Sequence, residues 1–134
     1  MVGSSRSQIE EMNSVWGVIV KEKYGKVTIA PNVLLTIVRL TTLSVPGVSR
    51  MSGSLTSEMN RFLGRSHFDR GIRIEVQDDV VSVDLHIIVK PDINLLKLGR
   101  TIQSEVTRAI NDMVGMRVDQ VNVHIDNVDV ELTT

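Results

Sequence analysis

The side chains best suited to acid–base or metal chemistry are two histidines, each close to an aspartate. His86 follows Asp84 by two residues, and Asp126 follows His124 by two residues. A two-residue repeat places side chains on one face of a β-strand, so each pair would point to the same side. On neighbouring strands, the four groups would form a cluster able to bind a metal ion or to transfer protons.

A metal site needs ligands in matched geometry, which spacing along two strands does not establish. The simpler interpretation is a polar sheet face that is solvated or covered by a partner. The third histidine, His67, stands alone, and the sequence has no His-Glu-x-x-His, no Gly-x-Ser-x-Gly and no phosphate-binding loop. We therefore predict no catalytic residue, no metal, no cofactor and no enzymatic activity.

The strands that would position these groups are a hairpin at residues 71–90 and a strand near residues 118–126. Apolar and polar residues alternate along both, which is the pattern of a strand with one buried face. Asp78-Asp79 can form a two-residue hairpin turn. With that turn, apolar residues of the hairpin face apolar residues, and Arg73 faces Asp84 as an opposite-charge pair.

The polar positions of these strands share one face of the sheet. They are predicted to form an interaction surface that consists of Arg73, Glu75, Asp84, His86, Asn122 and His124. The alternation changes phase at Asp126-Asn127, which indicates a bulge or the end of the sheet. The sequence leaves open whether this surface is available to a partner or is covered by the N-terminal segment.

A long helix is predicted at about residues 94–114, between the hairpin and the last strand. Asp92 or Asn94 can cap its beginning, and Gly115 can end it. Its apolar residues recur at three- and four-residue spacing, which predicts one buried stripe. The stripe consists of Leu95, Leu98, Ile102, Val106, Ala109, Ile110 and Met113.

The N-terminal half adds a strand near residues 26–30, a helix at about residues 32–44 that begins around Pro31, and a short strand at residues 48–51. The apolar face of this helix is predicted to contain Val33, Leu34, Ile37, Val38 and Thr41. Together, the elements predict an α+β fold: a small mixed sheet, formed by the hairpin and the strands near 26–30 and 118–126, with the two main helices on one face.

The length of 134 residues predicts one domain. We expect this α/β domain to occupy residues 25–134 and residues 1–24 to be a partly disordered N-terminal extension. Within that extension, residues 8–24 are predicted to form a short helix leading into a strand. The absence of cysteine excludes disulfides, and no apolar run of the sequence reaches the length of a membrane span.

A mildly basic segment lies between the two halves and is predicted to be a mobile connection over residues 52–70. Arg61, Arg65 and Arg70 are predicted to form an anion-binding loop there. Nucleic-acid binding through residues 61–73 is therefore the alternative function. The acidic excess of the chain after residue 70 weakens this alternative, because nucleic-acid binding normally needs a basic face.

Six stretches of strand-forming or helix-forming sequence follow one another in a characteristic order and spacing. They are Gly25–Val33, Val45–Val48, Gly71–Val76, Val81–Val89, Val106–Gly115 and Val121–Ile125. Together they resemble the alkaline shock protein family of envelope stress-response proteins over about residues 25–128.

The resemblance implies a small α/β domain without catalytic activity, in a cytoplasmic protein that associates with itself. It also implies a role in cell-envelope homeostasis, close to the membrane, through a small membrane-anchored relative or partner. We therefore expect a self-associating scaffold that is peripheral to the cell membrane and does not span it, and we do not expect nucleic acid to be its main partner.

Overall fold

The computed structural model describes residues 19–53 and 66–130 of the chain. In order, the elements are β1 (Ile19–Glu22), β2 (Gly25–Thr28), α2 (Pro31–Ser44), β3 (Val48–Met51), β4 (Ser66–Asp69), β5 (Ile72–Gln77), β6 (Val80–Val89), α3 (Leu95–Val114) and β7 (Arg117–Val128). The predicted α+β fold is confirmed. The predicted helix within residues 8–24 and its boundary with the domain lie largely outside the described residues and stay predictions.

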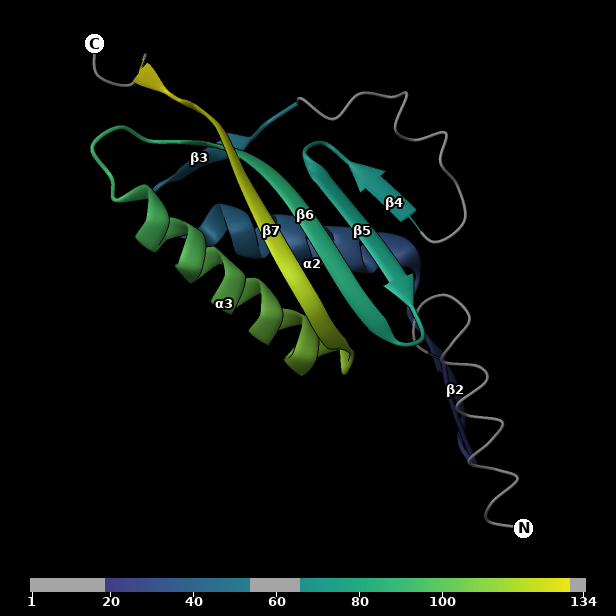
Figure 1. The fold of residues 1–134 in the computed structure, drawn as a ribbon. Coiled ribbons are helices and arrows are strands. Elements are labelled where there is room, and N and C mark those ends of the chain that lie inside the picture. Colours follow the sequence, from purple (N-terminus) through teal and green to yellow (C-terminus); the bar gives the residue numbers. More distant parts are fainter. Residues whose placement is uncertain (1–18, 54–65, 131–134) are drawn as a thin grey trace.

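The strand β6 is the centre of a five-stranded sheet (Figure 1). Along one side it pairs with β5 over residues 80–85 and with β3 over residues 87–89, both antiparallel. Along its other side it pairs with β7 in parallel. The sheet is completed by β4, which pairs with β5. The sheet is therefore mixed, as predicted, and β3, β4 and β7 each pair with one other strand only.

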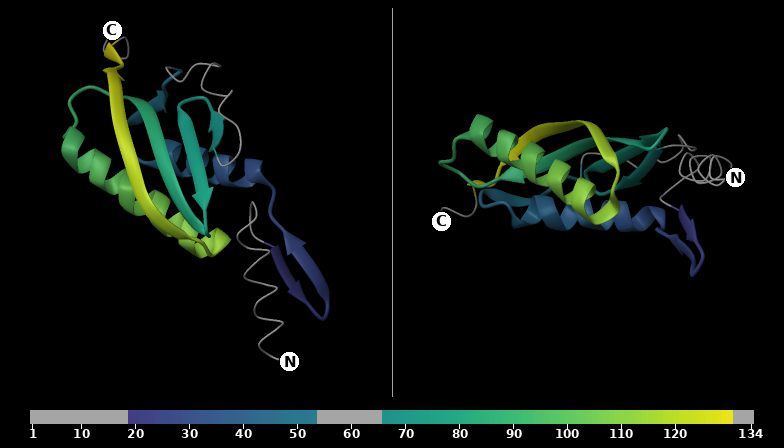
Figure 2. Two further views of the ribbon diagram at one scale, coloured as in Figure 1. Left: turned by 45° about the vertical axis from the view of Figure 1, so that its right-hand side comes forward. Right: turned by 90° about the horizontal axis from the view of Figure 1, so that it is seen from below.

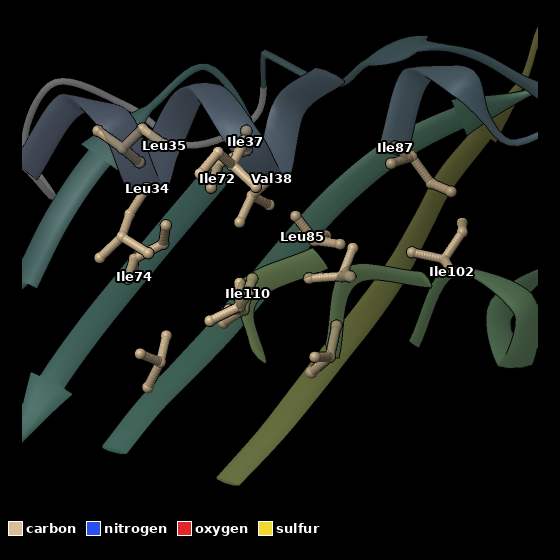
Figure 3. Packing of buried hydrophobic residues seen from close by; sticks show 14 of the residues in the cluster. Leu34, Leu35, Ile37, Val38, Ile72, Ile74, Leu85, Ile87, Ile102 and Ile110 are labelled. Carbon is tan, nitrogen blue, oxygen red and sulfur yellow. The ribbon is translucent and has the colours of Figure 1, made fainter. Parts of the chain in front are cut away.

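Both main helices cover the same face of this sheet, as the view from below shows (Figure 2). Side chains from α2, α3 and the sheet meet in one aliphatic core (Figure 3). Its fully buried members include Leu34, Ile72, Ile74, Leu85, Ile87, Ile102 and Ile110. Aliphatic residues dominate this core because the sequence has few aromatic residues.

The β5–β6 hairpin has the predicted register. Gln77 faces Val80, so Asp78 and Asp79 are the whole turn. Both aspartates have positive φ, 53° and 65°, which is the backbone of a type I′ turn. Aspartate tolerates this left-handed conformation less well than glycine.

Replacing Asp79 with glycine is expected to stabilise the protein by about 0.5–1 kcal/mol at neutral pH, because glycine adopts the positive φ without strain. Burial, with the neighbouring charge of Asp78, raises the pKa of Asp79, while Arg117 lowers it. The folded state thus disfavours the charged carboxylate, and this cost appears as pH rises above the ordinary value of 3.8. In urea unfolding, Asp79→Gly should raise the free energy of unfolding more at neutral pH than below pH 3.8. An equal increase at both pH values would show that the charge of Asp79 does not contribute.

The helix α3 begins and ends as predicted. The Asn94 side chain accepts a hydrogen bond from the Lys97 amide at 3.0 Å, and Gly115 ends the helix with a φ of 78°. The predicted stripe is wrong at both ends, since Leu95 and Met113 are exposed. Because the sheet is twisted, the side of this 20-residue helix that contacts the sheet changes gradually along its length. The buried stripe therefore does not include the residues predicted at its two ends.

Two bulges interrupt the pairing of β7 with β6. One lies at Asp126, where the sequence predicted a bulge, and the other lies at Asp119, where it did not. The edge of β7 is partly covered by α3, because the Gln103 side chain of α3 donates a hydrogen bond to the Val121 carbonyl at 3.0 Å. Such cover protects an outer strand from pairing with other chains.

Two expectations for the N-terminal half are corrected by the structure. The predicted strand near residues 26–30 does not join the main sheet, because β2 pairs with β1 as a separate two-stranded hairpin. All four residues of β2 are exposed, so this strand has no buried face. Residues 66–69, expected to be part of a mobile connection, form β4, whereas residues 54–65 lie outside the described residues.

Candidate functional site

The six predicted residues of the polar sheet face lie together on the side of the sheet away from the helices. We call this group the polar face: Arg73 and Glu75 of β5, Asp84 and His86 of β6, and Asn122 and His124 of β7. The register aligns them in rows across the three strands. Arg73 pairs with Asp84, and Asp84 with Asn122. His86 pairs with His124.

Asp84 is the centre of the first row. Its carboxylate accepts a hydrogen bond from the Asn122 amide at 2.9 Å and lies 2.9 Å from Nη2 of Arg73. Nε2 of His124 is 3.8 Å from the same carboxylate, and Arg73 is also 3.9 Å from Glu75. Groups on all three strands therefore hold one another in fixed positions.

The second row is a stack of two imidazole rings. The ring centroids of His86 and His124 are 4.4 Å apart, with an angle of 14° between the planes. Nδ1 of His86 lies 3.2 Å from both carboxylate oxygens of Asp126. The predicted approach of Asp84, His86, His124 and Asp126 is thus observed, and the bulge at Asp126 lies at the end of this row.

The polar face contains the residue types that can bind a metal ion, two histidines and several carboxylates. In the described ranges, no group of three or more histidine, aspartate or glutamate side chains has a geometry that could hold a metal ion. Within the polar face, the carboxylates of Glu75 and Asp84 lie beside one arginine, Arg73, and Asp126 adds a carboxylate next to His86. Arg50 and Arg117 lie on the same side of the sheet, in register with Ile88 and Val80, so basic groups flank the polar face at both ends.

The predicted anion-binding loop is only partly described. Arg70 is exposed in the turn between β4 and β5, whereas Arg61 and Arg65 lie outside the described residues. His67, the remaining histidine, belongs to β4 and pairs with Ile74. Burial lowers the pKa of the His67 imidazole.

Sequence reasoning missed an apolar surface on the outer side of α2. Val33, expected in the core, is 41% exposed, Leu40 is 61% exposed and Leu43 is 40% exposed. Arg39 is the only charged residue of α2, and its guanidinium is bound to the Asp69 carboxylate of β4. The signal in the sequence is a helix of 14 residues with a single charge, since a helix with one buried face normally has polar residues opposite it.

Two shallow grooves lie beside α3. One, of about 350 Å³, lies between α3 and β7 and includes Leu96 and Gly99. The other, of about 410 Å³, lies between the end of α2 and the beginning of α3 and includes Val45, Pro46 and Ile93. No residue of the polar face lines either groove.

Among the helices that the structure describes, none has the length and apolar character needed to cross a bilayer.

Comparison with known proteins gives one family and several distant relatives. A profile of the alkaline shock protein 23 family, described as having a cell envelope-related function, matches residues 19–130. The uncharacterized protein YqhY of Bacillus subtilis (strain 168) is 25% identical over 101 residues, which cover 75% of each chain. The uncharacterized protein YloU of the same organism is 22% identical over 110 residues, covering 81% of this chain and 92% of YloU.

Among solved structures, the MamM CTD is similar over 73% of this chain and 95% of that domain. Its sequence identity is 14% and the TM-score is 0.40. A similarity at this level says nothing about function.

Proposed function

Because the chain belongs to the alkaline shock protein 23 family, which has a cell envelope-related function, we propose that it is a non-enzymatic scaffold protein. In this proposal the protein is cytoplasmic, associates with copies of itself and is recruited to the membrane by a small membrane-anchored partner. Its role is to maintain the cell envelope under stress.

The observation that carries this proposal is the polar face. Its charged and hydrogen-bonding groups contact one another on a sheet surface, and neither groove beside α3 includes any of them. An enzyme normally gathers such groups around a pocket that encloses the substrate. A fixed, exposed set of polar side chains instead supports the binding of a protein surface.

The described N-terminal elements leave the polar face open. The β1–β2 hairpin comes just before α2 in the chain. It projects from the beginning of that helix, away from the sheet (Figures 1 and 2). The side chain of His124 is 49% exposed, so it can contact a partner directly. In this proposal, the polar face is the surface that binds the membrane-anchored partner.

Capture of a partner from solubilised membranes of the native cell tests the proposal. The immobilised chain is expected to retain a small integral membrane protein in near-stoichiometric amount. Replacing His124 with alanine removes the stacked ring and should reduce capture roughly tenfold, as for the loss of a central contact residue. Arg108→Ala is the matched control, because Arg108 lies exposed on the outer side of α3, away from the sheet face.

Protein and nucleic acid are both quantified in the bound fraction. Equal capture by the two variants would show that the polar face is not the binding site. Bound RNA without a protein partner would favour the alternative function through residues 61–73. No capture at all would contradict membrane recruitment.

A further inference from the structure

The helix α2 has a second apolar stripe, on the side opposite the core. Val33, Thr36, Leu40 and Leu43 are all exposed. Their successive spacings, three, four and three residues, are those of the a and d positions in helices that pair side by side. Intrachain packing of the described residues leaves this helix-pairing stripe uncovered.

We propose that α2 pairs with α2 of a second copy, antiparallel about a two-fold axis. This inference rests on the self-association proposed above and identifies the surface that carries it. An axis level with Val38, at the middle of the helix, places Val33 against Leu43 of the second copy. It also places Thr36 against Leu40 of the second copy, so the stripe is complementary to itself.

The charge distribution of α2 favours a second copy over a charged partner. A two-fold interface brings each side chain near its own symmetry mate, so a charge near the axis would meet a like charge. The only charged residue of α2 is Arg39, which already pairs with Asp69. Arg39 is one residue from the proposed axis, and its pairing with Asp69 offsets its charge and so reduces the repulsion between copies. The four residues of the stripe themselves are uncharged and offer a basic or acidic partner nothing to pair with.

The helix pair alone is too short for a stable interface. A helix of 14 residues spans about 21 Å, whereas stable interfaces bury roughly 1,200 Å² or more in total. Further apolar surface lies at both ends of α2. The β1–β2 hairpin, next to the beginning of α2, exposes 87% of Tyr24 and 61% of Val27.

The second groove lies at the other end of α2 and includes Val45, Pro46, Ile93 and Leu98. An antiparallel pair brings the beginning of each α2 next to the end of the other. The exposed hairpin of each copy is thereby brought towards the groove of its partner. This exchange extends the contact at both ends, as a dimer of the complete domain requires.

Sedimentation velocity of the full chain over a range of concentrations tests this arrangement. Leu40→Glu would bury two carboxylates near the axis and is expected to weaken association roughly tenfold or more. Thr36→Leu adds apolar contact with Leu40 of the second copy and is expected to tighten association several-fold. Leu96→Glu is the matched control, because Leu96 is 71% exposed on α3, outside the stripe, and should leave association unchanged.

The outcomes distinguish self-association through α2 from self-association through another surface. A chain that is monomeric at every concentration, with and without Thr36→Leu, would overturn both self-association and the α2 interface. A dimer that is unaffected by Leu40→Glu would overturn only the α2 interface. If Leu40→Glu instead destabilises the fold in urea without changing association, the stripe is covered within its own chain and the inference fails.

Discussion

Replacing Gly71 with alanine is expected to destabilise the protein by about 3–5 kcal/mol or to prevent folding. Gly71 has a φ of 72°, which disfavours any residue with a Cβ. A Cβ there would lie 2.5 Å from the Ser52 carbonyl oxygen and 2.7 Å from the His86 carbonyl oxygen. Both contacts are with backbone atoms, so no side-chain rotation relieves them.

The His86 carbonyl oxygen also accepts one of the hydrogen bonds that join the ends of β3, β5 and β6. The Ser52 amide donates to the His86 carbonyl at 2.8 Å, and the His86 amide donates to the Gly71 carbonyl at 2.7 Å. Moving the chain to accommodate a methyl group would therefore break bonds that hold three strands together. An unpaired buried backbone group adds a further cost.

Gly115→Ala is the matched control for this prediction. Gly115 has a similar φ of 78°, but nothing lies within 4 Å of a Cβ built there. Its replacement should cost only the conformational strain of about 1–2 kcal/mol. Equal losses for the two variants in urea unfolding would show that the contacts with Ser52 and His86 are unimportant.

Truncating Ile110 to alanine is expected to destabilise the protein by about 2–5 kcal/mol. Ile110 is fully buried between α3 and the sheet (Figure 3). Removing its branched side chain loses the hydrophobic transfer free energy and leaves a cavity that the rigid sheet cannot fully close. The measurement is the free energy of unfolding in urea.

Met113→Ala provides the comparison on the same helix. Met113 is 66% exposed, although its spacing in the sequence matches the buried stripe. Its truncation should change the free energy of unfolding by about 0.5 kcal/mol or less. A large loss at Met113 would mean that the stripe read from the sequence, and not the structure, describes the packing of α3.

The hairpin, and the face that its polar residues share, could be predicted because successive side chains of a strand point to opposite faces of the sheet. Once the Asp78-Asp79 turn fixes the pairing of β5 with β6, a shift of one residue would expose every apolar side chain. The alternation of residues 121–125 places Asn122 and His124 on one face, but the sequence does not determine that β7 pairs with β6 and so brings His124 beside His86. The four residues of the polar face on β5 and β6 follow from the hairpin register, whereas Asn122 and His124 join them only through the pairing of β7 with β6.

Strands of four residues, and a helix that is apolar on two sides, are not constrained by alternation in this way. The four residues of β2 are all exposed, so no buried face indicates its partner. The four residues of β4, Ser66–Asp69, show no clear alternation of apolar and polar residues. The helix α2 is apolar on two sides, and periodicity alone does not reveal which side meets the sheet.

The position of β6 between all its partners also determines the order in which the chain can fold. Its pairing with β5 closes a two-residue loop, which forms within microseconds. Its pairing with β7 requires the whole of α3 in between, and its pairing with β3 joins residues 48–51 to residues 87–89. We therefore expect the β5–β6 hairpin to form early, and the non-local pairings of β6 with β7 and β3 to limit the folding rate.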